Sequence, residues 1–286
     1  MGLVLMSGCF GPSVPCAEPF VPEDGACVLP EAEETPAEEP RLWSADEAMS
    51  HLAETLAYGV PEPTALASAY ARAVLEGDPG CPEFLADAVP GTGQGLWVDE
   101  CTATSGWTYS GTSLYSDERT ESTRSLRMTA AFTVTDADGD PFQGGGEVLY
   151  ESASAAGVTD WSGQVGGVFG WRGEDGWLGE ARGEALFLEG TRDDASHSLR
   201  LDGGVEYAGA TIGFTGFSLD TATCAGDAPV DAPGTVEVRD PTGVWFVLDL
   251  PGDCTGCGEL RVAQEPLGPA CVSLEALVAM SPMEAG

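Results

Sequence analysis

The sequence has no lysine and no asparagine, a single isoleucine (Ile212) and only two histidines. Without asparagine there is no N-x-[ST] acceptor, so N-glycosylation is excluded. These absences, together with abundant Gly, Ala, Glu, Asp and Pro, are typical of a GC-rich genome. Histidine is the usual base beside a Ser or Cys nucleophile, so only His51 and His197 could serve such a mechanism. We interpret His51 as structural or exposed on a helix, and His197 as part of a solvated hairpin turn.

The usual catalytic signatures are also missing. There is no G-x-S-x-G elbow, no H-E-x-x-H, no Walker A sequence and no G-x-G-x-x-G that opens a helix. Two carboxylates can hydrolyse a glycosidic bond, but with 47 acidic residues any pair could converge, so their abundance does not discriminate. We therefore assign no catalytic residues and favour a non-enzymatic protein.

The chain is strongly acidic, with 47 Asp and Glu against 11 Arg and a formal net charge of -36. Such a charge repels phosphate backbones and anionic lipid surfaces, so nucleic-acid binding is rejected. Salt adaptation, display on an outer surface and collection of divalent cations would each produce this charge, and charge alone does not separate them.

The first nine residues are a short apolar run followed by Met6, Ser7, Gly8 and Cys9. This stretch resembles the box that precedes the lipid-modified cysteine of bacterial lipoproteins, although Met6 stands in place of the usual Leu, and the basic and full apolar regions of a signal peptide are absent. A misplaced start codon would account for both departures. The resemblance implies removal of residues 1–8, a lipid on Cys9 and a bacterial outer-membrane or cell-surface location, with the membrane as a partner. The alternative is a cytoplasmic N-terminus that happens to contain a cysteine.

Eight cysteines remain when Cys9 is set aside. An even number without metal-ligand spacing indicates an oxidising compartment and disulfide bonds. The candidates are Cys16, Cys27, Cys81, Cys101, Cys224, Cys254, Cys257 and Cys271. Pairing neighbours in sequence would join Cys16 to Cys27 and Cys81 to Cys101, but connectivity stays open. Cys254 and Cys257 have CxxC spacing without the helix of a redox site or a second CxxC for zinc, so bridges to Cys224 or Cys271 are favoured.

The chain divides by composition into a tether, a helical segment and a β region. Residues 9–41 are rich in Pro and Glu, and we interpret them as a disordered acidic tether. Residues 42–94 are helical: Ser44 and Glu47 form a capping-box pattern that predicts a helix ending at Gly59 and Pro61. A second helix is predicted over 63–76, and a short third one after Pro82.

Residues 95–272 show the period-two pattern of strands. Strands are expected near 106–115, 124–135, 146–155, 158–170, 180–191, 196–207, 210–218, 234–240, 243–250 and 258–263. No crossover helix separates them, so the fold class is mainly β: a large antiparallel meander, curled sheet or barrel behind a small helical segment. Interior glycines indicate strong curvature. Residues 273–286 are taken as a C-terminal tail, and no segment after the N-terminus has the apolar length of a spanning helix.

One short run could hold a metal ion. Asp136, Asp138 and Asp140 alternate in DADGD, and calcium prefers several oxygen ligands on a flexible loop. Glu147 occupies position 12 counted from Asp136, as an EF-hand requires, but Pro141 and the following glycines favour an acidic hairpin turn. Calcium is accordingly the only candidate cofactor.

Tryptophans are frequent in the β region and could form a sugar- or lipid-binding surface, although such residues more often fill a core. They are Trp97, Trp107, Trp161, Trp171, Trp177 and Trp245. The leading hypothesis is a cell-envelope lipoprotein that acts as a non-enzymatic binding or structural module, with an envelope protein, glycan or lipid as ligand. The alternatives are a carbohydrate-active hydrolase with paired carboxylates in a tryptophan-lined groove, and a calcium-dependent adhesive protein.

Overall fold

The computed structural model describes residues 21–23, 26–28, 41–86, 92–137, 139, 141–173, 176–224 and 230–280. The chain divides into two units, 1–40 and 41–286. In the first unit, β1 (Val21–Glu23) pairs antiparallel with β2 (Ala26–Val28) inside the stretch interpreted as a tether. The other residues of that unit, including Cys9 and Cys16, lie outside the described residues.

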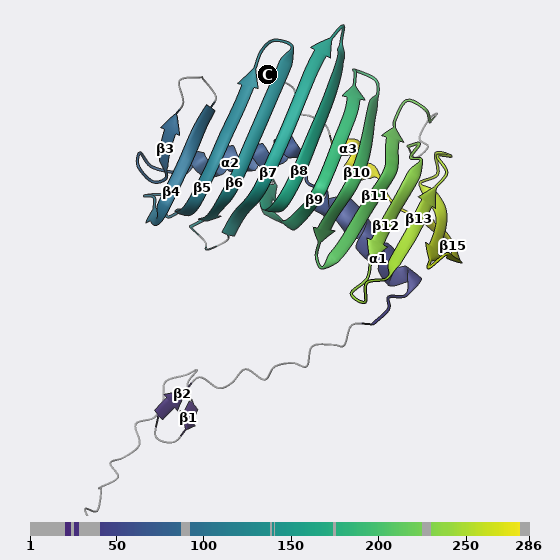
Figure 1. Cartoon of the computed structure of the whole chain (residues 1–286), viewed down its shortest axis with the longest axis horizontal. Helices are drawn as coiled ribbons and strands as arrows, with labels where there is room; N and C mark the ends of the chain where they lie inside the picture. The colour runs from purple at the N-terminus through teal and green to yellow at the C-terminus, as the bar shows by residue number, and fades with distance from the viewer. Residues whose placement is uncertain are drawn as a thin grey trace, which may run out of the picture. The chain divides into compact units, whose positions relative to one another are not determined.

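The second unit is built on one sheet of 13 strands whose order in space is their order in the chain. The strands are β3 (Glu83–Ala86), β4 (Thr92–Thr102), β5 (Thr108–Arg119), β6 (Thr123–Thr135), β7 (Pro141–Ala155), β8 (Val158–Gly173), β9 (Gly176–Arg192), β10 (His197–Tyr207), β11 (Ala210–Asp220), β12 (Gly234–Arg239), β13 (Trp245–Leu250), β14 (Cys257–Val262) and β15 (Glu265–Cys271). Every neighbouring pair is antiparallel, and β3 and β15 are its two edges (Figure 1). The predicted fold class is confirmed, as an open meander.

The first strand of this sheet corrects one expectation. A short helix was predicted after Pro82, but Glu83–Ala86 is β3, which pairs with β4 from Glu83 opposite Leu96 to Ala86 opposite Gly93. Such a short segment carries no periodicity that distinguishes helix from strand. Pairing with β4 decides the conformation, and the disulfide between Cys81 and Cys101 joins the same two segments.

Helices cover one face of the sheet (Figure 1). Helix α1 (Ala45–Glu54) starts with the predicted capping box, in which Ser44 and Glu47 satisfy each other's backbone N–H groups. It continues as the π-helix η1 (Thr55–Gly59), and α2 (Pro63–Leu75) follows. Helix α1 packs on β11 and β12, η1 on β9 and β10, and α2 on β7 and β8, so the helical segment crosses the middle of the sheet.

A further helix lies in the stretch taken as a C-terminal tail. Helix α3 (Glu275–Ala279) packs against η1 and β10, and Leu277 on it is fully buried. Its five residues are too few for a helical period to be recognised in the sequence. None of the described helices is long and apolar enough to cross a membrane.

Strand residues alternate between the two faces, as the pleat requires. On β6 the buried positions Leu126, Met128 and Phe132 face the helices, whereas Arg127 and Thr129 face away. Their buried counterparts on neighbouring strands, such as Val148, Leu188 and Leu201, complete a core between the sheet and the helices. The other face of β6 to β10 therefore has no described element over it, and its residues decide what the sheet presents to solvent.

Glycines let neighbouring strands approach each other closely where the sheet curves. Gly146 on β7 lies opposite Gly167 on β8, and both have positive φ angles. A Cβ on Gly146 would lie 2.0 Å from the carbonyl oxygen of Gly166, so no other residue fits there. The register shifts next to Gly167, which is the mark of a β-bulge that bends the strand. The predicted role of strand glycines in curvature agrees with this geometry.

Candidate functional site

A groove runs along the face of the sheet that the helices leave open. It is a hollow of about 820 Å³ across β6, β7, β8, β9 and β10. Two rows of side chains that stand opposite each other on successive strands line it. The first row is Ser125, Glu151, Ser162, Glu189 and Arg200, and the second is Arg127, Leu149, Gln164, Phe187 and Asp202. The long middle strands of the meander thus place ten side chains on one surface.

Both arginines of the groove form ion pairs. Arg200 Nη1 lies 3.1 Å from Glu189 Oε1, and Arg200 Nε lies 2.9 Å from Asp202 Oδ2. At the other end, Arg127 Nη2 lies 2.6 Å from Glu147 Oε1. Both arginines are thereby held in place and neutralised by carboxylates on the same face.

The larger hollow contains an exposed aromatic ring on β9, the fourth of its five strands. Phe187 keeps 48% of its surface exposed, and its register neighbours are Gln164 on β8 and Asp202 on β10. Leu149 on β7 is half-buried beside Gln164. An aromatic residue on the open side of a sheet, among polar neighbours, does not contribute to the core.

A second hollow of about 780 Å³ adjoins the first toward the β5–β6 and β7–β8 hairpins. The two share Ser125, Glu151, Ser162 and Glu189. The second adds Arg119, Thr123, Asp160 and Trp161. The open face therefore carries one continuous groove, with the four shared residues in its middle.

A buried ionic cluster underlies this end of the sheet. Arg124, only 4% exposed, donates from Nε and Nη2 to the Asp117 carboxylate over 2.9 and 3.0 Å, and its guanidinium lies 5.7 Å from the Tyr150 ring centre. Burial opposes ionisation of Asp117, but hydrogen bonds from Arg119 and Arg124 lower its pKa to about 2. Burial next to Asp117 raises the pKa of Tyr115 to about 12. Asp117 is thus held as a carboxylate.

Glu62 caps the helix that covers this cluster. Its carboxylate accepts hydrogen bonds from the backbone N–H groups of Thr64, over 2.9 Å, and Ala65, over 2.6 Å. Burial raises the pKa of Glu62, whereas these hydrogen bonds and the charge of Arg124 act in the opposite direction. The arrangement satisfies the N-terminus of α2, and we assign it a structural role.

Asp136, Ala137 and Gly139 of the DADGD segment lie between β6 and β7, whose facing ends pair Thr135 with Pro141. Gly139 N–H donates to the Asp136 carbonyl oxygen over 3.1 Å, and Asp136 is only 7% exposed. Glu147 lies well inside β7, opposite Thr129 and ion-paired with Arg127. The antiparallel pairing of β6 with β7 confirms the hairpin interpretation. Asp138 and Asp140 lie outside the described residues, so calcium binding by the three aspartates stays a prediction.

The six candidate cysteines whose side chains the structure describes form three disulfides, and these lie toward the two ends of the sheet. Cys81 is bonded to Cys101, Cys224 to Cys254 and Cys257 to Cys271. The predicted bridges from Cys254 and Cys257 to Cys224 and Cys271 are confirmed, and so is the Cys81–Cys101 pair. Cys16 and the side chain of Cys27 lie outside the described residues.

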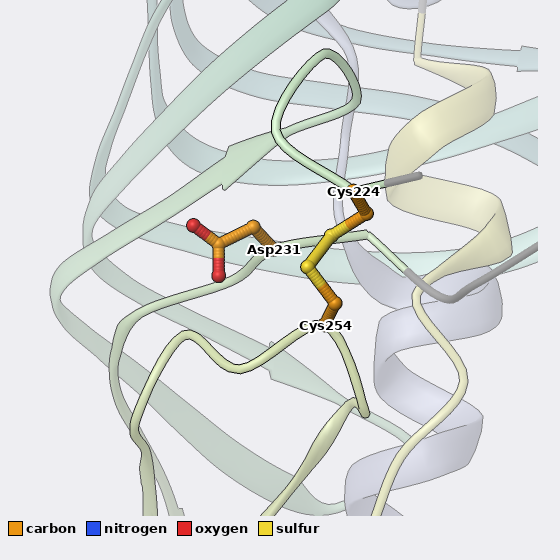
Figure 2. Close-up of side chains that lie close together, drawn as sticks. All are labelled: Cys224, Asp231 and Cys254. Carbon is orange, nitrogen blue, oxygen red and sulfur yellow. A yellow bond between two sulfur atoms is a disulfide. The ribbon is translucent and has the colours of Figure 1, made fainter. Parts of the chain in front are cut away.

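One disulfide has a carboxylate beside it. Figure 2 shows Asp231 next to the Cys224–Cys254 bridge, and one carboxylate oxygen lies within 4.8 Å of both sulfurs. Metal ions bind thiolates, and these two sulfurs are bonded to each other. Because the sulfurs are bonded to each other, no metal site follows from this group. It is the only three-residue group of metal-ligand type in the part of the chain that the structure describes.

The histidines differ from each other. His51 stacks on Trp43 with 4.2 Å between ring centres, in agreement with a structural role. The expectation of a solvated His197 is wrong: the residue is 8% exposed at the start of β10, and neither ring nitrogen has a hydrogen-bond partner. Burial and the charge of Arg192 lower its pKa. The flanking DDAS turn suggested solvent, but pairing of β10 with β9 and β11 turns this side chain to the covered face.

None of the tryptophans whose side chains the structure describes lines the larger hollow. Trp161 is 4% exposed and packs in the core, and it borders only the second hollow. Trp107 and Trp245 are half-buried. The side chains of Trp97, Trp171 and Trp177 lie outside the described residues. Filling of the core was the expectation favoured for these residues, and Trp161 meets it.

Comparison of the chain with protein-family models, with curated proteins and with solved structures gave no match. The assignment of the candidate site therefore depends on the geometry of its residues alone. Sequence reasoning did not single out the groove residues, although the alternation of β9 around Phe187 and Glu189 carried a signal. An apolar residue at a position whose neighbours on the same face are charged indicates a surface site rather than a core.

Proposed function

We propose that this chain is a non-enzymatic binding module of the bacterial cell envelope, anchored through a lipid on Cys9. The groove on the open face of β6 to β10 is its binding surface. The observation that carries the proposal is the exposed Phe187 ring, which is 48% exposed between two ion-paired arginines on the rigid middle of the sheet. Rigid strands hold such groups in register, which lowers the entropic cost of binding.

The envelope location is supported by the N-terminal box and by the cysteine chemistry. Three disulfides form among the described residues, and such bonds persist in oxidising compartments. The acidic surface is consistent with a protein that is displayed away from anionic lipids.

Binding is favoured over hydrolysis by the state of the carboxylates. Glu151 and Glu189 stand two strands apart, on either side of Ser162, which corresponds to about 10 Å between backbones. Glu189 is 60% exposed and ion-paired with Arg200, so the groove does not enclose it in the apolar surroundings of a general acid. The pair therefore serves better as hydrogen-bond acceptors than as an acid and a base.

The anchor is tested by the intact mass of protein from its native envelope, alkylated without reduction. We expect loss of residues 1–8, a lipid adduct on Cys9 and no alkylated cysteine. An unprocessed chain with alkylated cysteines would contradict both the anchor and the oxidising location.

The binding surface is tested by co-sedimentation of the purified full-length chain with isolated envelopes. We expect the double variant Phe187→Ala/Arg200→Ala to lose binding by about tenfold or more, because aromatic and arginine residues at the centre of an interface dominate affinity. The control is Leu114→Ala/Arg239→Ala, which removes an exposed leucine and an exposed arginine from the same sheet outside the groove. Equal binding by both double variants would contradict the assignment.

A further inference from the structure

The charges of the groove restrict the ligand it can hold. Two arginines and three carboxylates line the larger hollow, so its formal charge is -1. Each arginine is already paired with a carboxylate, and the whole chain carries -36. An anionic ligand would have to displace an existing ion pair against a repulsive field. Anionic polymers are therefore disfavoured.

The paired groups match hydroxyl groups well. A hydroxyl both donates and accepts a hydrogen bond. Arg200 places guanidinium N–H groups beside the acceptor oxygens of Glu189 and Asp202, within 3.1 and 2.9 Å. The Gln164 amide and the Ser162 hydroxyl add further mixed donors and acceptors along the two rows. A ligand with many neutral hydroxyl groups can use these atoms without breaking the ion pairs.

Phe187 supplies the apolar contact that such a ligand needs. The ring is 48% exposed, and it lies between the polar side chains of Gln164 and Asp202 in the second row. A pyranose ring has a face of C–H groups that can pack on an aromatic face, while its equatorial hydroxyls point sideways toward polar neighbours. An aromatic platform with lateral hydrogen-bonding groups is therefore present in the larger hollow.

The length of the groove indicates a chain rather than a single sugar. It crosses five strands, and four spacings between strands correspond to about 19 Å. The second hollow extends the surface to residues of β5. The open shape leaves both ends of a bound chain free to continue.

From these observations we infer that the groove binds a neutral oligosaccharide segment, laid across β6 to β10 with one sugar ring on Phe187. This inference rests on the proposed function and gives its ligand a chemical class. A protein partner would use the same groove differently, and the test below distinguishes the two.

The experiment modifies the envelopes instead of the protein. One portion of isolated envelopes is oxidised with periodate, which cleaves vicinal diols, and is then quenched and washed. A second portion is digested with a protease, which is then inactivated and washed away. Binding of the full-length wild-type chain to each is measured by co-sedimentation, with Phe187→Ala/Arg200→Ala as the reference for groove-dependent binding. We expect periodate to abolish the groove-dependent fraction and protease to leave it.

Competition then tests the charge of the ligand. Polysaccharide released from the same envelopes is separated on an anion exchanger into a neutral and an acidic fraction. We expect the neutral fraction to compete for the groove and the acidic fraction to compete at least tenfold less well.

The outcomes separate the two proposals. Groove-dependent binding that is lost after protease and survives periodate would overturn the oligosaccharide inference while the binding module stands. Stronger competition by the acidic fraction would overturn the neutral ligand. Absence of any groove-dependent binding to untreated envelopes would overturn the proposed function itself.

Discussion

The two faces of the middle strands carry different kinds of side chain, although successive residues of the same strands point alternately to one face and the other. On β9, Leu188 faces the helices and is 1% exposed, whereas its neighbour Phe187 faces the groove and is 48% exposed. On β6, Arg124 is 4% exposed in an ionic cluster, and Arg127 is exposed in the groove. The comparison teaches that the residue type does not reveal its role here, because a phenylalanine is exposed and an arginine is buried. The face of the sheet decides.

The largest expected effect comes from the apolar pair on β9. Leu188→Ala removes a fully buried side chain and leaves a cavity, so the free energy of unfolding should fall by about 2–5 kcal/mol. Phe187→Ala should lower it by about 1 kcal/mol or less, because the ring is already half exposed. Urea denaturation of both variants measures the difference. Comparable losses would contradict the assignment of the two faces, whereas binding to envelopes should fall in Phe187→Ala.

The next effect comes from the arginine pair on β6. Arg124→Ala leaves the buried Asp117 carboxylate with Arg119 as its remaining ionic partner, so we expect a loss of about 3 kcal/mol. Arg127→Ala breaks an exposed pair with Glu147, and solvent screening limits that loss to about 1 kcal/mol or less. If Arg127→Ala proved the more destabilising in urea, the ionic cluster would not be part of the core.

The smallest effect is a pH dependence at the covered face. His197 is buried with a lowered pKa, so the unfolded chain binds more protons than the folded one once the pH falls below the unfolded value of about 6.5. Stability should therefore fall with pH between 7 and 5.5, with a slope of at most about 1.4 kcal/mol per pH unit from this group. His197→Phe should flatten the profile relative to wild type.

Ser196→Ala is the matched control for His197, because it changes the same hairpin without changing a histidine. Its unfolding free energy should show the same slope as the wild type over this pH range. An unchanged slope in His197→Phe would contradict burial of a neutral imidazole.

Short sequence patterns were enough to predict part of the fold. Ser44 and Glu47 predicted the start of the first helix, because a capping box needs only four consecutive residues. The strands from β6 to β14 were predicted near their observed positions, and for the long ones the alternation over ten or more residues is unambiguous. The missed elements are β1, β2, β3, β4, β15 and α3. Four of them, β1, β2, β3 and α3, have three to five residues, too few for a period to be recognised in the sequence.

The candidate site was less predictable. Cys254 and Cys257 were correctly separated into two bridges because their spacing lacked the context of a redox or zinc motif. The groove was not foreseen, because the ten residues of its two rows come from five strands and no two of them form a recognisable motif. His197 was misread because its neighbours in sequence are polar, while its neighbours in space are strands.

The sequence by itself determined the mainly antiparallel β fold, the helical segment before it, the acidic charge and the parity of the cysteines, whereas the structure decided that the sheet is an open meander. Each of these depends on composition or on short periodic patterns. Only the tertiary structure decided which face of the sheet the helices cover, and with it the buried Arg124 and the exposed Phe187. Alternation sorts residues into two sets, but the burial of one set depends on helices that pack across strands far away in the chain.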